Sequence, residues 1–312
     1  MELLIWGGVF VVALIALIKG ADWVLDSSQK IGLALGMSPF LVGVVIIGFG
    51  TSLPELASSI FGMLSGASEI PAANAIGSNI ANILLVVGLA AVFSRSVLTV
   101  TKNLIDLEIP LLSLSTLIFF GIAYDGVITT AESLFLLAAF VLYLLYSFFQ
   151  RDSVDASSPM ERPKLSTLDF VMLIVGFVLL VGGAKYLIDA VLVISSVAGI
   201  SVGVVTIFAV AVGTSLPELI VSIKAALAKN AEVSIGNIFG SNIFNLLLVV
   251  GGAGLFGVQR LDAASVSLAL PMLLATTFFF VISGISNRIH VWEGAFYLLA
   301  YALFTAKLFG WV

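Results

Sequence analysis

Long apolar stretches fill most of the chain, and short polar segments separate them. A transmembrane helix needs about 20 consecutive, mainly apolar residues. Ten stretches meet this requirement, at residues 3–25, 38–65, 71–94, 104–124, 128–150, 167–190, 201–228, 232–257, 262–284 and 289–310. The pattern predicts an all-α integral membrane protein with ten transmembrane helices.

The composition excludes several classes of protein. The chain is 61% hydrophobic and only 10% charged, whereas soluble domains contain about 25% charged residues. It has no cysteine and one histidine, which excludes thiolate metal sites and histidine-rich zinc or proton-relay sites. A net charge of -5 gives no reason to expect a nucleic-acid partner. The sequence also lacks nucleotide-binding motifs and H-E-x-x-H, so we do not expect an enzyme.

Two motifs occur twice along the chain. GTSLPELASS begins at Gly50 and GTSLPELIVS at Gly213, while NAIGSNIANILLVVG begins at Asn74 and NIFGSNIFNLLLVVG at Asn237. Both pairs are separated by 163 residues, so we expect two homologous halves of five helices each. Because five is odd, the second half starts on the opposite side of the membrane, which predicts an inverted-topology repeat.

The break between the halves falls in the longest polar connection. We expect a first five-helix repeat at residues 1–150, a linker at 151–166 and a second five-helix repeat at 167–312. The linker is too short to hold a folded regulatory domain.

The distribution of lysine and arginine predicts the orientation. With ten helices both termini share a side, and nine basic residues then lie near the face of the linker, against three near the other. We therefore expect a multi-pass protein of the cell membrane, plasma or inner, with the linker in the cytoplasm and both termini outside.

The GTSLPE motif combines a helix breaker with a carboxylate. Pro54 and Pro217 lack the N–H group of a regular helix and should break it within the membrane. Glu55 and Glu218 follow directly, and an ionisable group at that depth costs roughly 3 kcal/mol even on the gentlest scale. The spacing predicts that the preceding hydroxyls share a helix face with the carboxylate of their own half; they are Thr51, Ser52, Thr214 and Ser215.

The second motif adds a polar stripe with a spacing of four residues. Its members are Asn74, Ser78 and Asn82 in the first half, and Asn237, Ser241 and Asn245 in the second. Together the motifs predict a cage of hard oxygen donors near the membrane midplane, which suits calcium, sodium, magnesium or manganese. Two ionised glutamates are neutralised by one calcium or by two to three sodium ions, which is the charge balance of an antiporter.

At these motifs the sequence resembles the calcium/cation antiporter superfamily, in its sodium/calcium exchanger branch of the prokaryotic type without a large regulatory loop. The resemblance implies exchange of three sodium ions for one calcium by alternating access. It places calcium between Glu55 and Glu218. The other implied ligands are Thr51, Thr214, Ser52, Ser215, Ser78, Ser241 and Asn82, together with the backbone near Gly48 and Ala211.

Asn245 departs from the family pattern, because exchangers of this branch often carry aspartate there. We keep Asn245 among the expected ligands and leave two alternatives open. They are an antiporter with potassium-dependent, calcium/proton or manganese coupling, and a passive cation channel. The missing enzyme motifs, and the lack of a histidine to act as base for a serine, argue against a hydrolytic membrane enzyme. We expect no cofactor and no obligate protein partner: the partners are the transported calcium and sodium ions and the lipid bilayer.

Overall fold

The computed structural model describes residues 1–35, 50–94, 98–99, 108–151, 163–228 and 231–312. Helices dominate these ranges, with four strands of two residues each. The first half contains α1 Glu2–Ala34, α4 Leu53–Leu64, α5 Ile70–Ile80, η2 Ala81–Val87, α6 Gly88–Ser94, β1 Leu98–Thr99, α7 Ile109–Ala123, β2 Val127–Ile128 and α8 Thr130–Arg151. The second half contains α9 Thr167–Ala198, α10 Val202–Val205, η4 Thr206–Val210, α11 Ala211–Thr214, α12 Leu216–Leu227, α13 Ala231–Phe244, η5 Asn245–Val249, α14 Val250–Ala253, η6 Gly254–Phe256, β3 Gln259–Arg260, η7 Ser265–Ala269, α15 Leu270–Ile285, β4 Arg288–Ile289 and α16 Val291–Leu308.

Within the described ranges, five helices are long and apolar enough to cross a membrane. They are Glu2–Ala34, Ile70–Ser94, Thr167–Ala198, Val233–Phe256 and Ser265–Ile285, and the bent pair Val202–Thr214 and Leu216–Leu227 adds a sixth span. The helices α1 and α9 contain 33 and 32 residues and run beyond their expected ends at 25 and 190. Helices of this length exceed the thickness of the hydrocarbon core, and tilting is one way in which a bilayer accommodates them.

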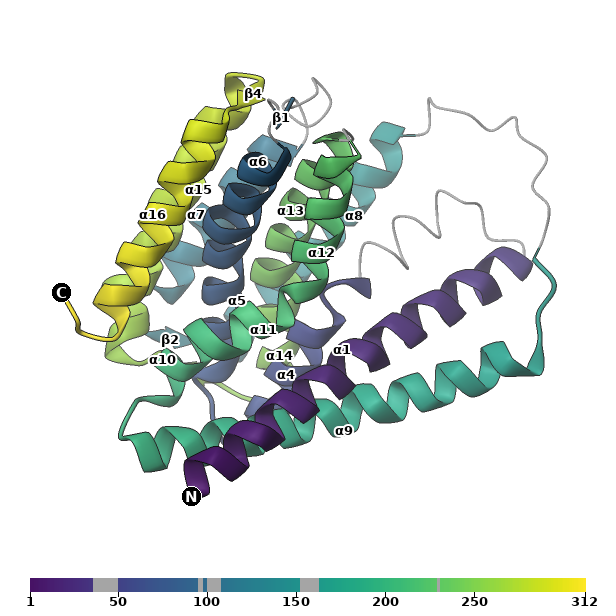
Figure 1. Ribbon diagram of the computed structural model, residues 1–312, viewed down its shortest axis with the longest axis horizontal. Helices are drawn as coiled ribbons and strands as arrows, with labels where there is room; N and C mark the ends of the chain where they lie inside the picture. Colours follow the sequence, from purple (N-terminus) through teal and green to yellow (C-terminus); the bar gives the residue numbers. More distant parts are fainter. Residues whose placement is uncertain (36–49, 95–97, 100–107, 152–162, 229–230) are drawn as a thin grey trace.

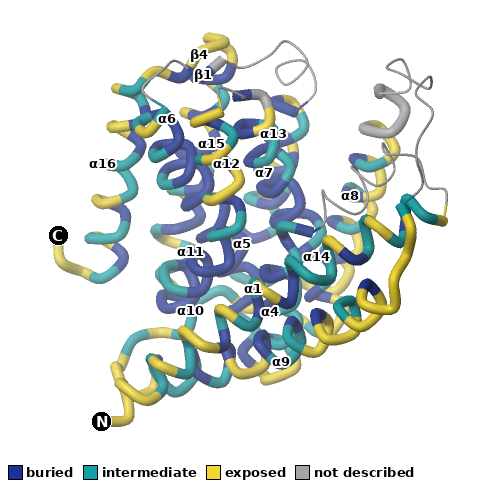
Figure 2. Tube along the Cα trace, turned by 45° about the vertical axis from the view of Figure 1, so that its right-hand side comes forward, coloured by how far each residue is buried: buried dark blue, intermediate teal, exposed yellow. Residues whose placement is uncertain are grey.

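Two continuous helical segments form the centre of the molecule. The segments α5–η2–α6 and α13–η5–α14 are mostly buried, while α7, α8, α15 and α16 pack around them. Figure 2 shows the buried residues concentrated in these central helices, and more exposed residues along α9 and the start of α1. The second repeated motif, which begins at Asn74 and Asn237, therefore lies on the most enclosed helices of the fold, whereas GTSLPE lies at the start of α4 and α12.

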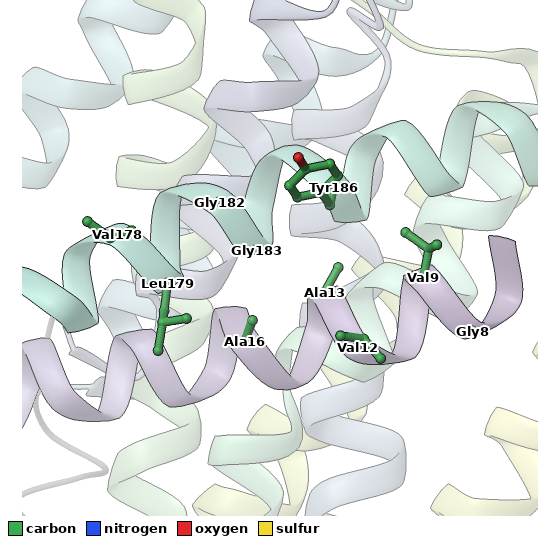
Figure 3. Close-up of a pocket in the computed structure, with 10 residues that line it drawn as sticks. All are labelled: Gly8, Val9, Val12, Ala13, Ala16, Val178, Leu179, Gly182, Gly183 and Tyr186. Atoms are coloured by element: carbon green, nitrogen blue, oxygen red, sulfur yellow. The ribbon is translucent and has the colours of Figure 1, made fainter. Parts of the chain in front are cut away.

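The helices α1 and α9 pack along each other and cross the other helices obliquely (Figure 1). Glycine allows this close approach. A Cβ atom at Gly183 would lie 2.5 Å from the backbone nitrogen of Leu17 and 2.9 Å from the carbonyl oxygen of Ala13. Gly20 and Gly176 meet the partner helix in the same way. Beside this contact, the two helices line an apolar groove of about 490 Å³ (Figure 3).

Polar caps set the ends of the long helix α9. The Asp169 carboxylate accepts hydrogen bonds from the backbone N–H and the hydroxyl of Ser166, at 2.9 Å each, which forms a capping box. Gly199 ends the helix in the left-handed conformation, at φ 66°. Asp169 also forms an ion pair with Lys30 at 3.1 Å, which joins the C-terminal part of α1 to the first turn of α9.

Proline begins several of the helices. Pro54, Pro71, Pro110, Pro217 and Pro271 each lie in the first turn of α4, α5, α7, α12 and α15, respectively. At Pro54 and Pro217, which follow a break, the missing N–H group costs nothing, since the first N–H groups of a helix have no partner within it. Pro271 instead follows the π-helix η7 inside the continuous span Ser265–Ile285.

Short antiparallel strands connect the two halves of the chain. β1 pairs with β4, with Leu98 opposite Ile289, and β2 pairs with β3, with Val127 opposite Arg260. The labels β1 and β4 stand at one end of the helices and β2 near the other (Figure 1). Each pair therefore joins a loop of the first half to a loop of the second.

The contact between α1 and α9 gives a first prediction. Gly183→Ala should force the two helices apart, and overpacking of this kind typically costs about 1–3 kcal/mol. We expect the thermal unfolding midpoint of the purified protein in detergent to fall by several degrees. Gly182→Ala is the matched control, because a Cβ there meets no described atom within 4 Å. Equal midpoints for the two variants would contradict the close packing.

Candidate ion-binding site

Both GTSLPE motifs interrupt a helix at their serine. Ser52 and Ser215 adopt nearly the same backbone angles, with φ of -90° and -81° and ψ of 7° in both. At Ser215 the chain bends by 45° between α11 and α12. The predicted breaks are thus present. The expectation that the hydroxyl residues share one helix face with the glutamate is wrong, because α4 and α12 begin only after Ser52 and Ser215.

The two glutamates lie fully inside the protein. Glu55 is 0% and Glu218 is 1% exposed, and their carboxylates are close enough for the charges to interact. Ser215 of the second half donates a hydrogen bond to Glu55 Oε1 at 3.4 Å, and Thr214 also lies against this carboxylate. The GTSLPE turn of one half therefore supplies the hydroxyls that face the acid of the other.

Glu218 has hydroxyl neighbours from both halves. Ser241 donates a hydrogen bond to Glu218 Oε1 at 3.3 Å, and Thr51 of the first half lies against the same carboxylate. The Thr51 and Ser241 hydroxyl oxygens are 3.4 Å apart. The two acids and their hydroxyl partners thus form one cluster at the interface of the halves.

A backbone carbonyl completes one side of this cluster. The Ala211 carbonyl accepts hydrogen bonds from the hydroxyls of Ser78 and Thr214, at 3.4 Å each. Gly77 makes the approach possible, because a Cβ there would lie 2.5 Å from the Ile207 carbonyl oxygen and 2.7 Å from the Ala211 Cβ. The absence of a side chain at Gly77 thus brings the Ser78 hydroxyl to the backbone of the second half.

Four asparagines lie where the central helices meet. Asn82 donates a hydrogen bond to the Asn242 side-chain oxygen and Asn79 donates one to the Asn242 carbonyl, both at 3.1 Å. Asn82 lies within the π-helix η2, and Asn245 begins the π-helix η5. Such widened turns are frequent at functional sites, because they redirect side chains and loosen the regular hydrogen bonding.

Several buried oxygen atoms of the expected ligands have no hydrogen-bond partner within the described ranges. They are Ser52 Oγ, Glu55 Oε2, Glu218 Oε2, Asn82 Oδ1 and Asn245 Oδ1. Buried polar atoms are normally paired, so these five oxygens are available to a ligand, although unpaired buried atoms also occur elsewhere, as at Thr116 and Thr276. In the part of the chain that is described, no three His, Cys, Asp or Glu side chains lie close enough together to hold one metal ion. Neutral oxygens must therefore supply most ligands of a cation bound there. This donor set suits a hard cation.

Eleven of the twelve ligands expected from the sequence lie in described ranges, and Gly48 lies outside them. The contacts given above join seven of the eleven directly, namely Glu55, Glu218, Thr51, Thr214, Ser215, Ser241 and Ala211. Ser78 joins them through the Ala211 carbonyl. Ser52, Asn82 and Asn245 are buried, and no described contact connects them to the glutamates.

The expected ligand set does not include two kinds of residue that the structure connects to this region. Asn79 and Asn242 form a hydrogen bond between the central helices. Ser58 and Ser59 follow Glu55 on α4, and their hydroxyls accept hydrogen bonds from Asn74. The repeated GSN sequence contains both asparagines, which is a signal for the first kind. Ser58 has no equivalent serine in the second half, so the repeat gives no signal for it.

Comparison with known proteins extends the likeness from the site to the whole chain. The family model described as sodium/calcium exchanger protein matches residues 5–149 and 168–310. The chain is 28% identical to the sodium/calcium exchanger MaX1 of Methanosarcina acetivorans, over 96% of this chain and 97% of that protein. An uncharacterised membrane protein of Methanocaldococcus jannaschii is 32% identical, also over 96% of this chain and 97% of its own.

Solved structures show the same relationship. The sodium–calcium exchanger NCX_Mj, soaked with 10 mM Na+ and zero Ca2+, superposes with a TM-score of 0.67 at 30% identity. The match covers 98% of this chain and 99% of that one. The fold is thus that of a helical, multi-pass membrane transporter and not of an enzyme. The chain belongs to the sodium/calcium exchanger protein family.

Proposed function

We propose that this chain is a secondary active antiporter that exchanges sodium for calcium across the membrane by alternating access. One observation carries the proposal: two fully buried glutamates from equivalent positions of the two halves share one cluster of hydroxyl and carbonyl oxygens. A cluster with one acid from each half can hold an ion at the boundary between them. A relative motion of the halves then makes the site accessible from one side of the membrane or from the other.

The charge of the cluster explains why exchange would be coupled. Two ionised carboxylates carry two negative charges, and an uncompensated charge in a low-dielectric environment costs many kcal/mol. One calcium ion or a set of sodium ions removes this cost, whereas an empty cluster keeps it. The protein would therefore cross between its states mainly when it is loaded, which is the requirement for an antiporter.

The proposed architecture is ten transmembrane helices arranged as two five-helix inverted-topology repeats, at residues 1–150 and 167–312. The strand pairs support it. β3 begins 161 residues after β1, and β4 begins 161 residues after β2. The pairing of β1 with β4 and of β2 with β3 is what a twofold axis between two inverted halves produces. The matching breaks at Ser52 and Ser215 support the same axis.

We place the site near the membrane midplane and the linker 151–166 in the cytoplasm, with both termini outside. The proposed ligands are Glu55, Glu218, Thr51, Thr214, Ser52, Ser215, Ser78, Ser241, Asn82, Asn245 and the backbone at Gly48 and Ala211. Three sodium ions for one calcium is the proposed ratio. With one calcium ion bound, the two glutamates and the ion have no net charge. With three sodium ions bound, the net charge is +1.

The coupling ion can be identified with purified protein in liposomes. We expect uptake of calcium-45 into sodium-loaded vesicles, little uptake with internal potassium or protons alone, and faster uptake when the membrane potential favours exit of one positive charge. Uptake that depends on potassium or follows a proton gradient would assign the related antiporter functions. Calcium flux without any counter-ion would indicate a channel.

Removal of either buried charge should abolish calcium transport. Glu55→Gln and Glu218→Gln keep the size and most hydrogen bonds of the side chain, but the remaining carboxylate cannot neutralise calcium. We expect uptake to fall to the level of empty liposomes, with folded protein still recovered. Asp125→Asn makes the same chemical change at an exposed turn, where the amide oxygen can still accept the bond from Val127 N, and should leave uptake unchanged. Near-normal uptake by either glutamine variant would contradict the site.

A further inference from the structure

We infer that Asn74 is a positioning residue that holds the backbone of Glu55 in place for ion binding; the inference rests on the proposed function of the site. Asn74 is fully buried on α5, and its side-chain nitrogen lies 3.2 Å from each of three oxygens on α4. They are the Glu55 carbonyl and the hydroxyls of Ser58 and Ser59. None of these atoms belongs to the expected ligands, so Asn74 would act through Glu55 and not on the ion.

Ser58 strengthens this arrangement. Its hydroxyl donates to the Pro54 carbonyl at 2.8 Å and to the Glu55 carbonyl at 3.1 Å, and Ser58 is fully buried as well. The Glu55 carbonyl thus receives side-chain hydrogen bonds from two residues. These bonds join the first turn of α4 to α5, the helix that also carries Ser78. The Glu55 carboxylate and the Ser78 hydroxyl, which is a second proposed ligand, then belong to one rigid unit.

The second half lacks the equivalent network. Val221 stands 163 residues after Ser58, so the equivalent hydroxyl is missing. Asn237, the counterpart of Asn74, is only partly buried and donates to Ser222 Oγ at 3.3 Å. Ser222 and Ser234 then bond each other's carbonyl oxygens, at 3.3 and 3.0 Å. Across the described ranges, no side-chain bond reaches the Glu218 carbonyl.

Because of this difference, Glu55 and Glu218 have different roles, although they occupy equivalent positions in the sequence repeat. Glu55 is a preorganised ligand whose backbone is bonded to α5, whereas the backbone of Glu218 lacks this support within the described ranges. A ligand that is fixed before binding raises the affinity for the ion, because less conformational entropy is lost on binding. Loss of Asn74 should therefore weaken calcium binding, whereas loss of Asn237 should not.

The test compares matched variants of the two halves. Asn74→Ala removes bonds to the Glu55 turn, and a net loss of about one or two hydrogen bonds predicts a calcium KM roughly ten-fold higher. We expect the maximal rate per folded molecule to stay within about two-fold, since the ligands themselves remain. Asn237→Ala should leave the calcium KM within about two-fold of the parent. An unchanged KM for Asn74→Ala, or an equal rise for both variants, would overturn the inference.

Ser58 provides a second pair that does not depend on the folding of Asn74→Ala. Valine and threonine have nearly the same shape and differ by one hydroxyl. Ser58→Val copies the second half and should raise the calcium KM, whereas Ser58→Thr should keep it near the parent value. The same KM for both variants would contradict the role of the hydroxyl.

Calcium affinity is also measured without transport, from the calcium-dependent rise of the thermal unfolding midpoint in detergent. For a merely structural role, Asn74→Ala lowers the midpoint but leaves the calcium dependence of the rise unchanged, which would overturn the inference. This measurement of affinity separates the proposed sodium/calcium exchange from the proposed role of Asn74. If the parent binds calcium but sodium does not drive its uptake, the coupling is wrong, while the order of affinities among the variants still tests Asn74.

Discussion

The burial of two carboxylates in the centre of a membrane protein is the constraint on which the rest of the structure depends. Glu55 and Glu218 are shielded from solvent and lie within each other's electrostatic influence. Burying one ionised carboxylate is costly, and placing a second beside it adds repulsion. Bound cations, or protons, must offset this cost. A site of this kind is stable only with a positive partner, and in the proposed function sodium and calcium take this place in turn.

The fold provides what such a site requires. Proline at the start of α4 and α12 breaks two helices, and the turns at Ser52 and Ser215 direct hydroxyls toward the acids. Gly77 allows the Ser78 hydroxyl to reach the Ala211 carbonyl. The short strands and the central helices connect both halves, so that neither half forms the cluster alone. The oblique pair α1 and α9 lies outside this centre and packs through glycine, where contacts are close but apolar.

Much of this arrangement could be predicted from the sequence because it depends on local chemistry. Proline in the interior of a long apolar segment favours a break, and a glutamate repeated after it in two such segments indicates a functional pair. The sequence wrongly predicts one helix face for Thr51, Ser52 and Glu55, since the position of the helix break, which lies at Ser52, decides how these side chains are arranged. The lengths of α1 and α9 and the π-helical turns at Asn82 and Asn245 depend on packing between distant segments. Asn74 illustrates the same limit, because its three acceptors lie on another helix.

The central claim is that one cluster takes either calcium or sodium. The most direct test is isothermal titration of calcium into the purified protein in detergent, in potassium buffer and again with increasing sodium. The account predicts one calcium ion per molecule, with an apparent affinity that falls steeply as sodium rises, and no calcium binding in Glu55→Gln or Glu218→Gln. Calcium binding that is independent of sodium, or that persists in either variant, would contradict it.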